Sequence, residues 1–241
     1  MCKKITVIAV VFILITLSAY AQDTLREKTE EKEIQIINVN DIKELIVEKF
    51  AEINDYTAEF EWINGDANYN GIIKYKKPSK ILLEFKKPEK QKIVSNGSVL
   101  YIYIPHLKVV IEQSLAESVE SEILTTTTEG GMKRLFDEYY FSFYDVSTTE
   151  EFMGIPAYHL KLQQKTPNVG FKNMDMWVST DGLILQSNGV STSGLKVSLT
   201  FKNIKINTEL PDYIFDFEVP PDAQIIRNLI VPFSSYKEDT E

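Results

Sequence analysis

The chain is poor in the residues from which most catalytic and metal sites are built. Its 241 residues include one cysteine, Cys2, and two histidines, His106 and His159. The histidines show no H-x-H or H-x-x-x-H spacing, so a metal site at either would depend on carboxylates alone. The G-x-S-x-G, G-x-x-x-x-G-K-[ST] and G-x-G-x-x-G motifs are also missing. We therefore expect no metal and no cofactor, and the composition argues against an enzyme.

The chain also lacks an apolar run long enough to cross a bilayer as a helix, which takes about 20 residues. The apolar segment at residues 5–17 is shorter, follows two lysines and precedes the small-residue sequence Ala19-Tyr20-Ala21. These features are typical of a cleaved signal peptide at residues 1–21. Cys2 precedes the apolar run, whereas a lipoprotein signal carries its cysteine at the cleavage point. We expect a soluble, unlipidated periplasmic protein.

After cleavage no cysteine remains, so burial of a core rather than disulfides must hold the fold. The formal net charge is −9 for the full chain and about −11 without its first 21 residues, which contain two lysines. Such acidity opposes binding to nucleic acid. Residues 22–33 are polar and highly charged, which predicts a flexible leader. Residues 34–241 are predicted to form one domain, and we expect a monomer.

Hydrophobic periodicity predicts one helix followed by many strands. Ile42, Leu45, Ile46 and Phe50 recur at helical spacing after Asn40, which is a suitable N-cap. Apolar and polar residues then alternate, which predicts strands. These strands are expected at residues 56–62, 73–77, 80–85, 92–95, 99–104, 140–146, 157–164, 174–178, 183–190 and 196–207.

Two regions depart from this alternation. Residues 112–139 contain a charged stretch and then Met132, Leu135 and Phe136 at helical spacing, which predicts short helices with mobile joints. Residues 210–221 predict a turn followed by a final extended segment. Asn96-Gly97 between two alternating runs predicts a hairpin.

The carboxylate and aromatic side chains of the predicted strands leave three functional interpretations open. Glu59 and Glu61 share a strand face and could act with His159 in a secreted hydrolase, although an exposed face explains them more simply. The many strand aromatics could line a lipid-sized cavity in a half-barrel. They could equally form the closed core of a structural envelope protein.

A series of motifs narrows these interpretations. Residues 71–105 contain G-I-I-K-Y-K-K-P, I-L-L-E-F-K-K-P, I-V-S-N-G and L-Y-I-Y-I-P, in this order, and residues 215–221 read F-D-F-E-V-P-P. In order and spacing these motifs resemble the LolA family of periplasmic outer-membrane lipoprotein carriers. The amphipathic helix that precedes them is similar as well.

The resemblance implies a mainly β fold with α-helices (α+β), in which an unclosed antiparallel half-barrel has helices covering its concave face. It implies a carrier that binds lipoprotein acyl chains in a hydrophobic cavity and moves lipoproteins from the inner to the outer membrane. Its partners would be acylated lipoproteins, an inner-membrane lipoprotein-releasing transporter and an outer-membrane acceptor. A carrier or sensor of other lipids on the same fold is the alternative.

The resemblance also implies particular site residues. The family's arginine before proline falls on Lys77, which would act as a latch for the lid, with the charge kept but the planar fork of donors lost. Alternation along the strands would direct the acyl-chain-binding side chains to one face. These positions are Phe60, Trp62, Ile73, Tyr75, Ile81, Leu83, Phe85, Ile93, Tyr101 and Tyr103.

Overall fold

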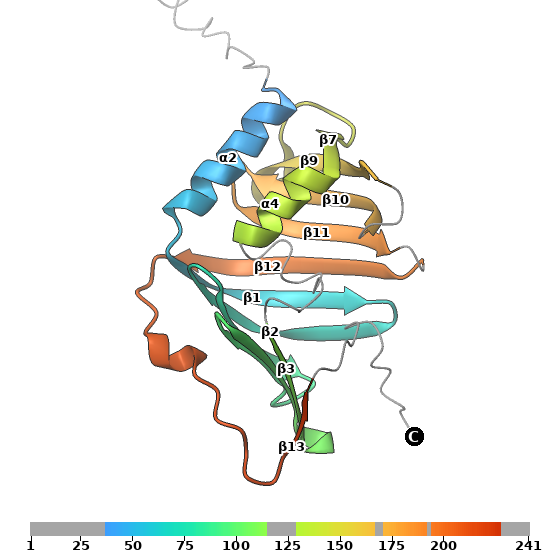
Figure 1. The fold of residues 1–241 in the computed structure, drawn as a ribbon. Helices are drawn as coiled ribbons and strands as arrows, with labels where there is room; N and C mark the ends of the chain where they lie inside the picture. The colour runs from blue at the N-terminus through green and yellow to red at the C-terminus, as the bar shows by residue number, and fades with distance from the viewer. Residues whose placement is uncertain (1–36, 115–128, 167–170, 192–193, 228–241) are drawn as a thin grey trace, which may run out of the picture. The chain divides into compact units, whose positions relative to one another are not determined.

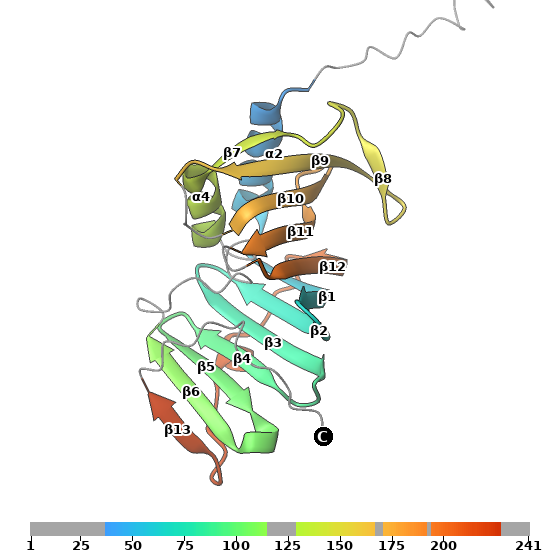
Figure 2. The same ribbon diagram turned by 90° about the vertical axis from the view of Figure 1, so that its right-hand side faces the viewer.

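The alternating segments of the sequence form one curved sheet. The computed structural model describes residues 37–114, 129–166, 171–191 and 194–227, and within them the strands form a 13-stranded sheet. The order is β13-β6-β5-β4-β3-β2-β1-β12-β11-β10-β9-β7, and β8 also pairs with β9 (Figures 1 and 2). In this part of the chain β13 and β7 end the path without pairing with each other, so the sheet does not close into a barrel.

The described part of the chain contains two α-helices, two 3₁₀ turns and thirteen strands. The helices are α2 (Val39–Glu52) and α4 (Glu129–Glu138), with 3₁₀ turns η1 (Pro105–Leu107) and η2 (Asp212–Phe215). The strands are β1 (Asp55–Asn64), β2 (Ala67–Lys76), β3 (Lys80–Lys87), β4 (Lys92–Asn96), β5 (Val99–Ile104), β6 (Val109–Ser114), β7 (Tyr139–Phe143), β8 (Glu150–Phe152), β9 (Ile155–Gln164), β10 (Phe171–Ser179), β11 (Ile184–Ser191), β12 (Lys196–Ile206) and β13 (Gln224–Arg227).

Strand pairing confirms the expected antiparallel sheet and adds two features to it. Strands β1 to β6 form an antiparallel meander, and β12 returns from the end of the chain to pair with β1, which joins the two halves of the sheet. The last strand, β13, pairs with β6 in parallel. Strands β6 and β8 were not predicted, because each is short and mixes polar with apolar residues, so its neighbours in the sheet decide its conformation.

Helix α2 begins two residues earlier than the sequence predicts. The N-cap is Asn38 rather than Asn40, and its side-chain oxygen accepts from the backbone N–H groups of Asn40 and Asp41 at 2.8 and 3.1 Å. The Asp41 carboxylate accepts from the Asn38 N–H at 2.9 Å. This reciprocal capping box satisfies the donors of the first turn, and either asparagine would suit that role by sequence alone.

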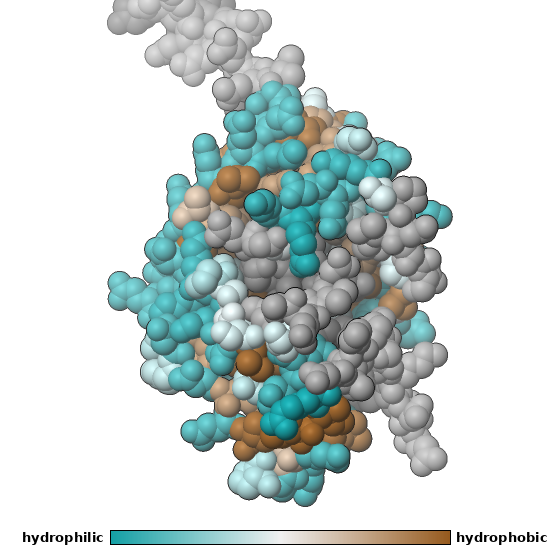
Figure 3. Space-filling model, in the orientation of Figure 1, coloured by the Kyte–Doolittle hydropathy of each residue, from teal (hydrophilic) through white to brown (hydrophobic). Residues whose placement is uncertain are grey.

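Both helices lie on one face of the sheet, which we call the concave face. They cross in front of β7 to β11, and the view turned by 90° keeps them on this side (Figures 1 and 2). Ile42, Ile46 and Phe50 of α2 and Leu135 of α4 are buried in the main hydrophobic cluster with side chains of the strands. The outer surfaces of the helices are largely hydrophilic (Figure 3). The helices therefore present their apolar sides to the sheet.

A smaller cluster lies on the opposite, convex face. Leu82 of β3 and Val94 of β4 pack there with Phe215 of η2, which is fully buried. Asp212 at the start of η2 forms ion pairs with Lys76 at 2.7 Å and with Lys80 at 3.3 Å. The final extended part of the chain is thus held on the outside of β3 and β4.

Several expectations lie outside the described residues. They are the signal peptide at 1–21, the leader at 22–33 and residues 115–128 of the region 112–139 in which short helices with mobile joints were expected. Within the described part, α4 confirms a helix around Met132 and Leu135, both buried.

Candidate functional site: the apolar concave face

The concave face is lined by eight of the ten expected acyl-chain-binding positions. They come from four adjacent strands, alternate along each strand, and are at most 5% exposed, as members of the main hydrophobic cluster. They are Phe60 and Trp62 of β1, Ile73 and Tyr75 of β2, Ile81, Leu83 and Phe85 of β3, and Ile93 of β4.

The aromatic residues of this face contact one another across the strands. Phe60 packs edge-on against Phe85 with ring centroids 5.3 Å apart, and Trp62 stacks on Tyr69 at 4.9 Å. Tyr69 in turn meets the edge of Phe85 at 6.0 Å. These cross-strand pairs make the wall continuous from β1 to β3. Tyr69 was not among the expected residues, although its alternation with Ile73 placed it on this face.

Tyr101 and Tyr103 lie elsewhere than expected. On β5 the residues Leu100, Ile102 and Ile104 belong to the cluster of the concave face, and the two tyrosines alternate with them. Both rings pack on Phe217, with centroids 5.3 and 6.1 Å away, on the convex face. The expectation that they line the hollow is corrected by the register of β5, because a one-residue difference moves a side chain to the other face.

Lys77 contacts the end of helix α2. Its Nζ donates to the backbone carbonyl of Ala51 at 2.8 Å, in the last turn of the helix. A cation is favourable there because carbonyl groups of the last turn have no partner within the helix and carry partial negative charge. The expected latch position therefore touches a helix that covers the concave face.

The same end of α2 is fixed by residues from the far end of β12. The side chain of Asn207 accepts from Asn54 N–H at 2.7 Å and donates to the carbonyl of Glu52 at 3.0 Å. The buried carboxylate of Asp55 accepts from the N–H and hydroxyl of Thr208 at 2.7 and 3.0 Å. These bonds connect α2, β1 and β12 into one rigid corner.

Charged groups also hold the last turn of α2 against the sheet. Lys49 Nζ lies 3.3 Å from Asp181 in the β10–β11 turn. Partial burial raises the pKa of Asp181, but hydrogen bonds from Ser179 and Lys49 lower it by more, so its pKa is below the ordinary value. For Lys49, burial lowers the pKa while Asp181 and Glu52 raise it, with a raised pKa as the net result. Both groups are therefore charged at neutral pH.

Helix α4 is joined to α2 and to the edge of the sheet by different contacts. Lys43 of α2 places Nζ 5.3 Å from the Phe136 ring and 5.4 Å from the Phe141 ring, within the range of cation–π attraction. Lys165, beyond β9, donates to the carbonyl of Phe136 at 3.0 Å. Tyr139 at the start of β7 exchanges hydrogen bonds with the backbone of Phe171.

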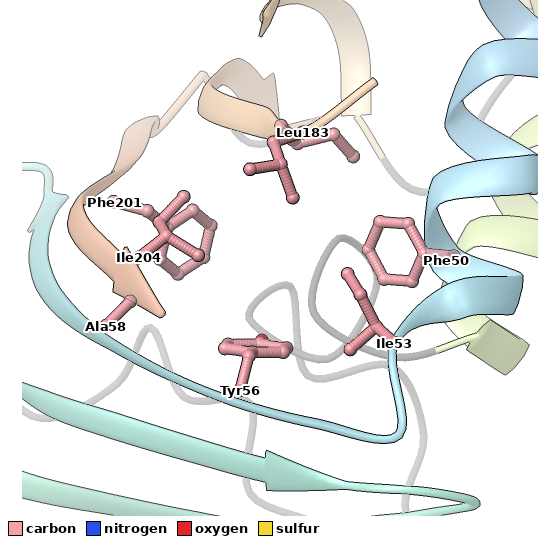
Figure 4. Close-up of a pocket in the computed structure, with 8 residues that line it drawn as sticks. Phe50, Ile53, Tyr56, Ala58, Leu183, Phe201 and Ile204 are labelled. Atoms are coloured by element: carbon pink, nitrogen blue, oxygen red, sulfur yellow. The ribbon is translucent and has the colours of Figure 1, made fainter. Parts of the chain in front are cut away.

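A small apolar cavity remains between the end of α2 and the sheet (Figure 4). Its volume is about 30 Å³, close to the share of one water molecule in the liquid. Ligand pockets for drug-sized molecules measure about 300–1,000 Å³. An acyl chain therefore needs side chains to move before it can enter here. The lining consists of Phe50, Ile53, Tyr56, Ala58, Leu183, Ile184, Phe201 and Ile204.

The residues of the hydrolase hypothesis do not come together. Glu59 and Glu61 are on β1 and exposed, and Glu61 pairs with Lys202 at 2.8 Å. His159 is on β9, four strand positions away along the sheet, which is about 19 Å at the usual strand spacing. In the described part of the chain, moreover, no group of three or more His, Cys, Asp or Glu side chains is placed to hold a metal ion.

An unclosed, curved sheet with an apolar concave face covered by helices defines a class of binding and carrier proteins. Residues 52–218 match the family model described as outer membrane lipoprotein carrier protein LolA. The chain belongs to this family, which is a carrier and not an enzymatic fold. None of the described helices has the length and apolarity to span a membrane.

Curated relatives carry the same description. The outer-membrane lipoprotein carrier protein of Actinobacillus succinogenes is 23% identical over 174 residues, covering 70% of this chain and 76% of the relative. That of Chromohalobacter salexigens is 22% identical over 187 residues, covering 73% of this chain and 81% of the relative.

Solved structures share the fold at low identity. An uncharacterized conserved protein from Thermus thermophilus superimposes with a TM-score of 0.54 at 14% identity, covering 78% of this chain and 98% of that one. A crystal structure of MucB gives a TM-score of 0.52 at 15% identity, covering 74% of this chain and 62% of that one.

Proposed function

We propose that this protein is a periplasmic carrier that binds the acyl chains of lipoproteins on its concave face and moves lipoproteins from the inner to the outer membrane. The observation that carries this proposal is the apolar wall of eight side chains within a region that matches the lipoprotein carrier family. Burial of acyl chains contributes about 0.8 kcal/mol per CH₂ group, so a carrier must shield these chains from water while the lipoprotein is between membranes.

Cargo enters when a helix separates from the sheet. The corner of α2, β1 and β12 is held by several hydrogen bonds, so we assign the displacement to α4, whose Met132 and Leu135 occupy the concave side. Withdrawing these two side chains would open the concave face over β7 to β11, beside the wall of β1 to β4. Lys77 then acts as a latch that keeps α2 in place while α4 moves.

The remaining parts of the proposal follow from the family. Export needs cleavage of the signal peptide near Ala21, loading needs a lipoprotein-releasing transporter in the inner membrane, and unloading needs an acceptor in the outer membrane. We propose that the carrier works as a monomer.

The test is a transfer assay with the mature protein. Membranes that contain a triacylated lipoprotein, or vesicles that contain labelled phospholipid, are incubated with the carrier, and soluble complexes are identified by native mass spectrometry. We expect release of the lipoprotein in a one-to-one complex. Transfer of phospholipid alone would support a carrier or sensor of free lipids, and a protein that takes up neither would contradict the proposal.

A further inference from the structure

The convex face of the sheet carries a row of four stacked rings. The centroids of Tyr144 and His159 are 4.1 Å apart, those of His159 and Trp177 4.0 Å, and those of Trp177 and Phe152 4.7 Å. The planes of neighbouring rings differ by 10–15°. The row joins β8, β10, β9 and the residue after β7. Each ring fixes the next, and Tyr144 at the end of the row is still 47% exposed.

A chain of hydrogen bonds runs beside these rings across four strands. Asp175 Oδ2 accepts from His159 Nε2 at 3.1 Å and from Asn188 Nδ2 at 2.8 Å. Asn188 also donates to Gln186 at 3.0 Å, and Gln186 donates to Thr200 at 2.8 Å. The side chains in this series of hydrogen bonds orient one another, so their remaining donors and acceptors point in fixed directions.

Tyr144 at the end of the row, together with Asp175 and Asn188 of the polar chain, borders an open groove of about 620 Å³. This volume lies within the range of about 300–1,000 Å³ of small-molecule sites. Besides apolar side chains such as Ile63 and Val190, the lining combines an aromatic ring, amides, a carboxylate and two ammonium groups. These residues are Tyr144, Lys161, Asn173, Asp175, Asn188 and Lys196.

Two lysines give the groove its charge. Lys161 and Lys196 are exposed, and neither makes an ion pair within the described residues. The one carboxylate of the lining, Asp175, already accepts two hydrogen bonds. In a chain of net charge −9, the groove is therefore a local site for an anion.

We propose that this groove binds a saccharide that carries a carboxylate or phosphate group. A sugar ring offers an apolar CH face to the exposed ring of Tyr144 and hydroxyl groups that can donate to the carboxylate of Asp175 and to the side-chain oxygen of Asn188, whose two N–H groups are already used. Lys161 and Lys196 hold its acidic group by charge-assisted hydrogen bonds. Cross-strand packing accounts for the stacked rings by themselves, and the observation that points to a ligand is the groove that gathers Tyr144, Asp175 and both lysines in one lining. This site lies on the face opposite the acyl-binding wall and does not depend on it.

The proposal is tested by isothermal titration of the mature protein with four probes. They are a muramic-acid-containing disaccharide, glucose 6-phosphate, neutral di-N-acetylchitobiose and inorganic phosphate. We expect one or both acidic sugars to bind at least tenfold more tightly than the neutral sugar and than phosphate, and their ranking identifies the acidic group. No binding of either acidic sugar, or equally tight binding of phosphate or of the neutral sugar, overturns the proposal.

Variants locate the binding. Tyr144→Ala is expected to weaken binding of the acidic sugar at least tenfold. The double variant Lys161→Met with Lys196→Met is expected to bind the acidic sugar no more tightly than the neutral one. Tyr140→Ala and Lys205→Met are matched controls, because both residues are exposed outside the groove. Circular dichroism checks that each variant is folded. Equal affinity for the groove variants and the controls would place the sugar elsewhere and overturn the proposal.

Discussion

The ammonium group of Lys77 donates a hydrogen bond of 2.8 Å to the backbone carbonyl of Ala51 in the last turn of α2. This contact connects the end of β2 to a helix that lies on the concave face. It needs one donor and a positive charge, which a lysine supplies as well as an arginine.

Replacing Lys77 by leucine should change cargo release more than folding. An exposed hydrogen bond contributes about 1 kcal/mol, so Lys77→Leu should lower the free energy of unfolding by about this amount, as measured by urea denaturation. Release of a fluorescent fatty acid should become faster, whereas Lys77→Arg should behave like the parent. Lys86→Leu is the control, since Lys86 is exposed on β3. Identical release by Lys77→Leu and the parent would remove the latch role.

Gly182 is expected to be intolerant of a side chain because α2 lies directly on it. Its φ is +89°, and a Cβ there would overlap the carbonyl oxygen of Leu45. Gly154 has φ of +79° but open space around it. Both alanine variants carry the cost of a left-handed backbone, and Gly182→Ala should lose about 1–3 kcal/mol more in stability through the clash. Equal losses in urea denaturation would mean that α2 does not sit on this turn.

Enlarging the apolar cavity should improve acyl binding. Phe50→Ala removes a ring that borders the 30 Å³ cavity and should cost about 3–5 kcal/mol of stability while increasing affinity for a fluorescent fatty acid. Phe215→Ala removes a fully buried ring from the convex cluster and should cost a similar amount without a gain in affinity. A gain in both variants would indicate nonspecific loosening, and a gain in neither would contradict binding at this cavity.

The ion pairs of Glu84 should make stability depend on pH. Partial burial raises the pKa of Glu84, but hydrogen bonds from Lys74 at 2.9 Å and Lys92 at 3.2 Å lower it by more, so its pKa falls below the ordinary 4.5. A carboxyl group whose pKa is lower in the folded than in the unfolded state stabilises the fold at pH values above its unfolded-state pKa. This stabilisation is lost as the pH falls through the folded-state pKa. Glu84→Gln should therefore lower the unfolding midpoint at pH 7 and have a smaller effect near pH 3.

The control for this pH dependence is Glu89→Gln, because Glu89 is exposed and makes no ion pair among the described residues. Its midpoint should follow the parent at both pH values. If Glu84→Gln lowers the midpoint equally at pH 7 and pH 3, packing rather than charge explains the loss.

Most of the sheet could be predicted because apolar and polar residues alternate within each of its longer strands. Strands β3, β4 and β5 begin where the alternation predicts, and the Asn96-Gly97 turn between the last two is in place. Strands β6, β8 and β13 could not be predicted, since their conformation comes from pairing with β5, β9 and β6. The facing of Tyr101 was missed for a related reason. Its segment V-L-Y-I-Y-I is apolar at every position, so alternation does not mark the inner face.

By itself the sequence determined a β-rich chain with an amphipathic helix, an alternating apolar face on β1 to β4, and the motifs of the carrier family. These properties are local, because period and motif are written in consecutive residues. Only the tertiary structure decided that Lys77 reaches Ala51, that Phe217 covers Tyr101, and that Tyr144, His159 and Trp177 form one stack. Each of these contacts joins segments far apart in the chain, whose meeting depends on the strand order and twist of the whole sheet.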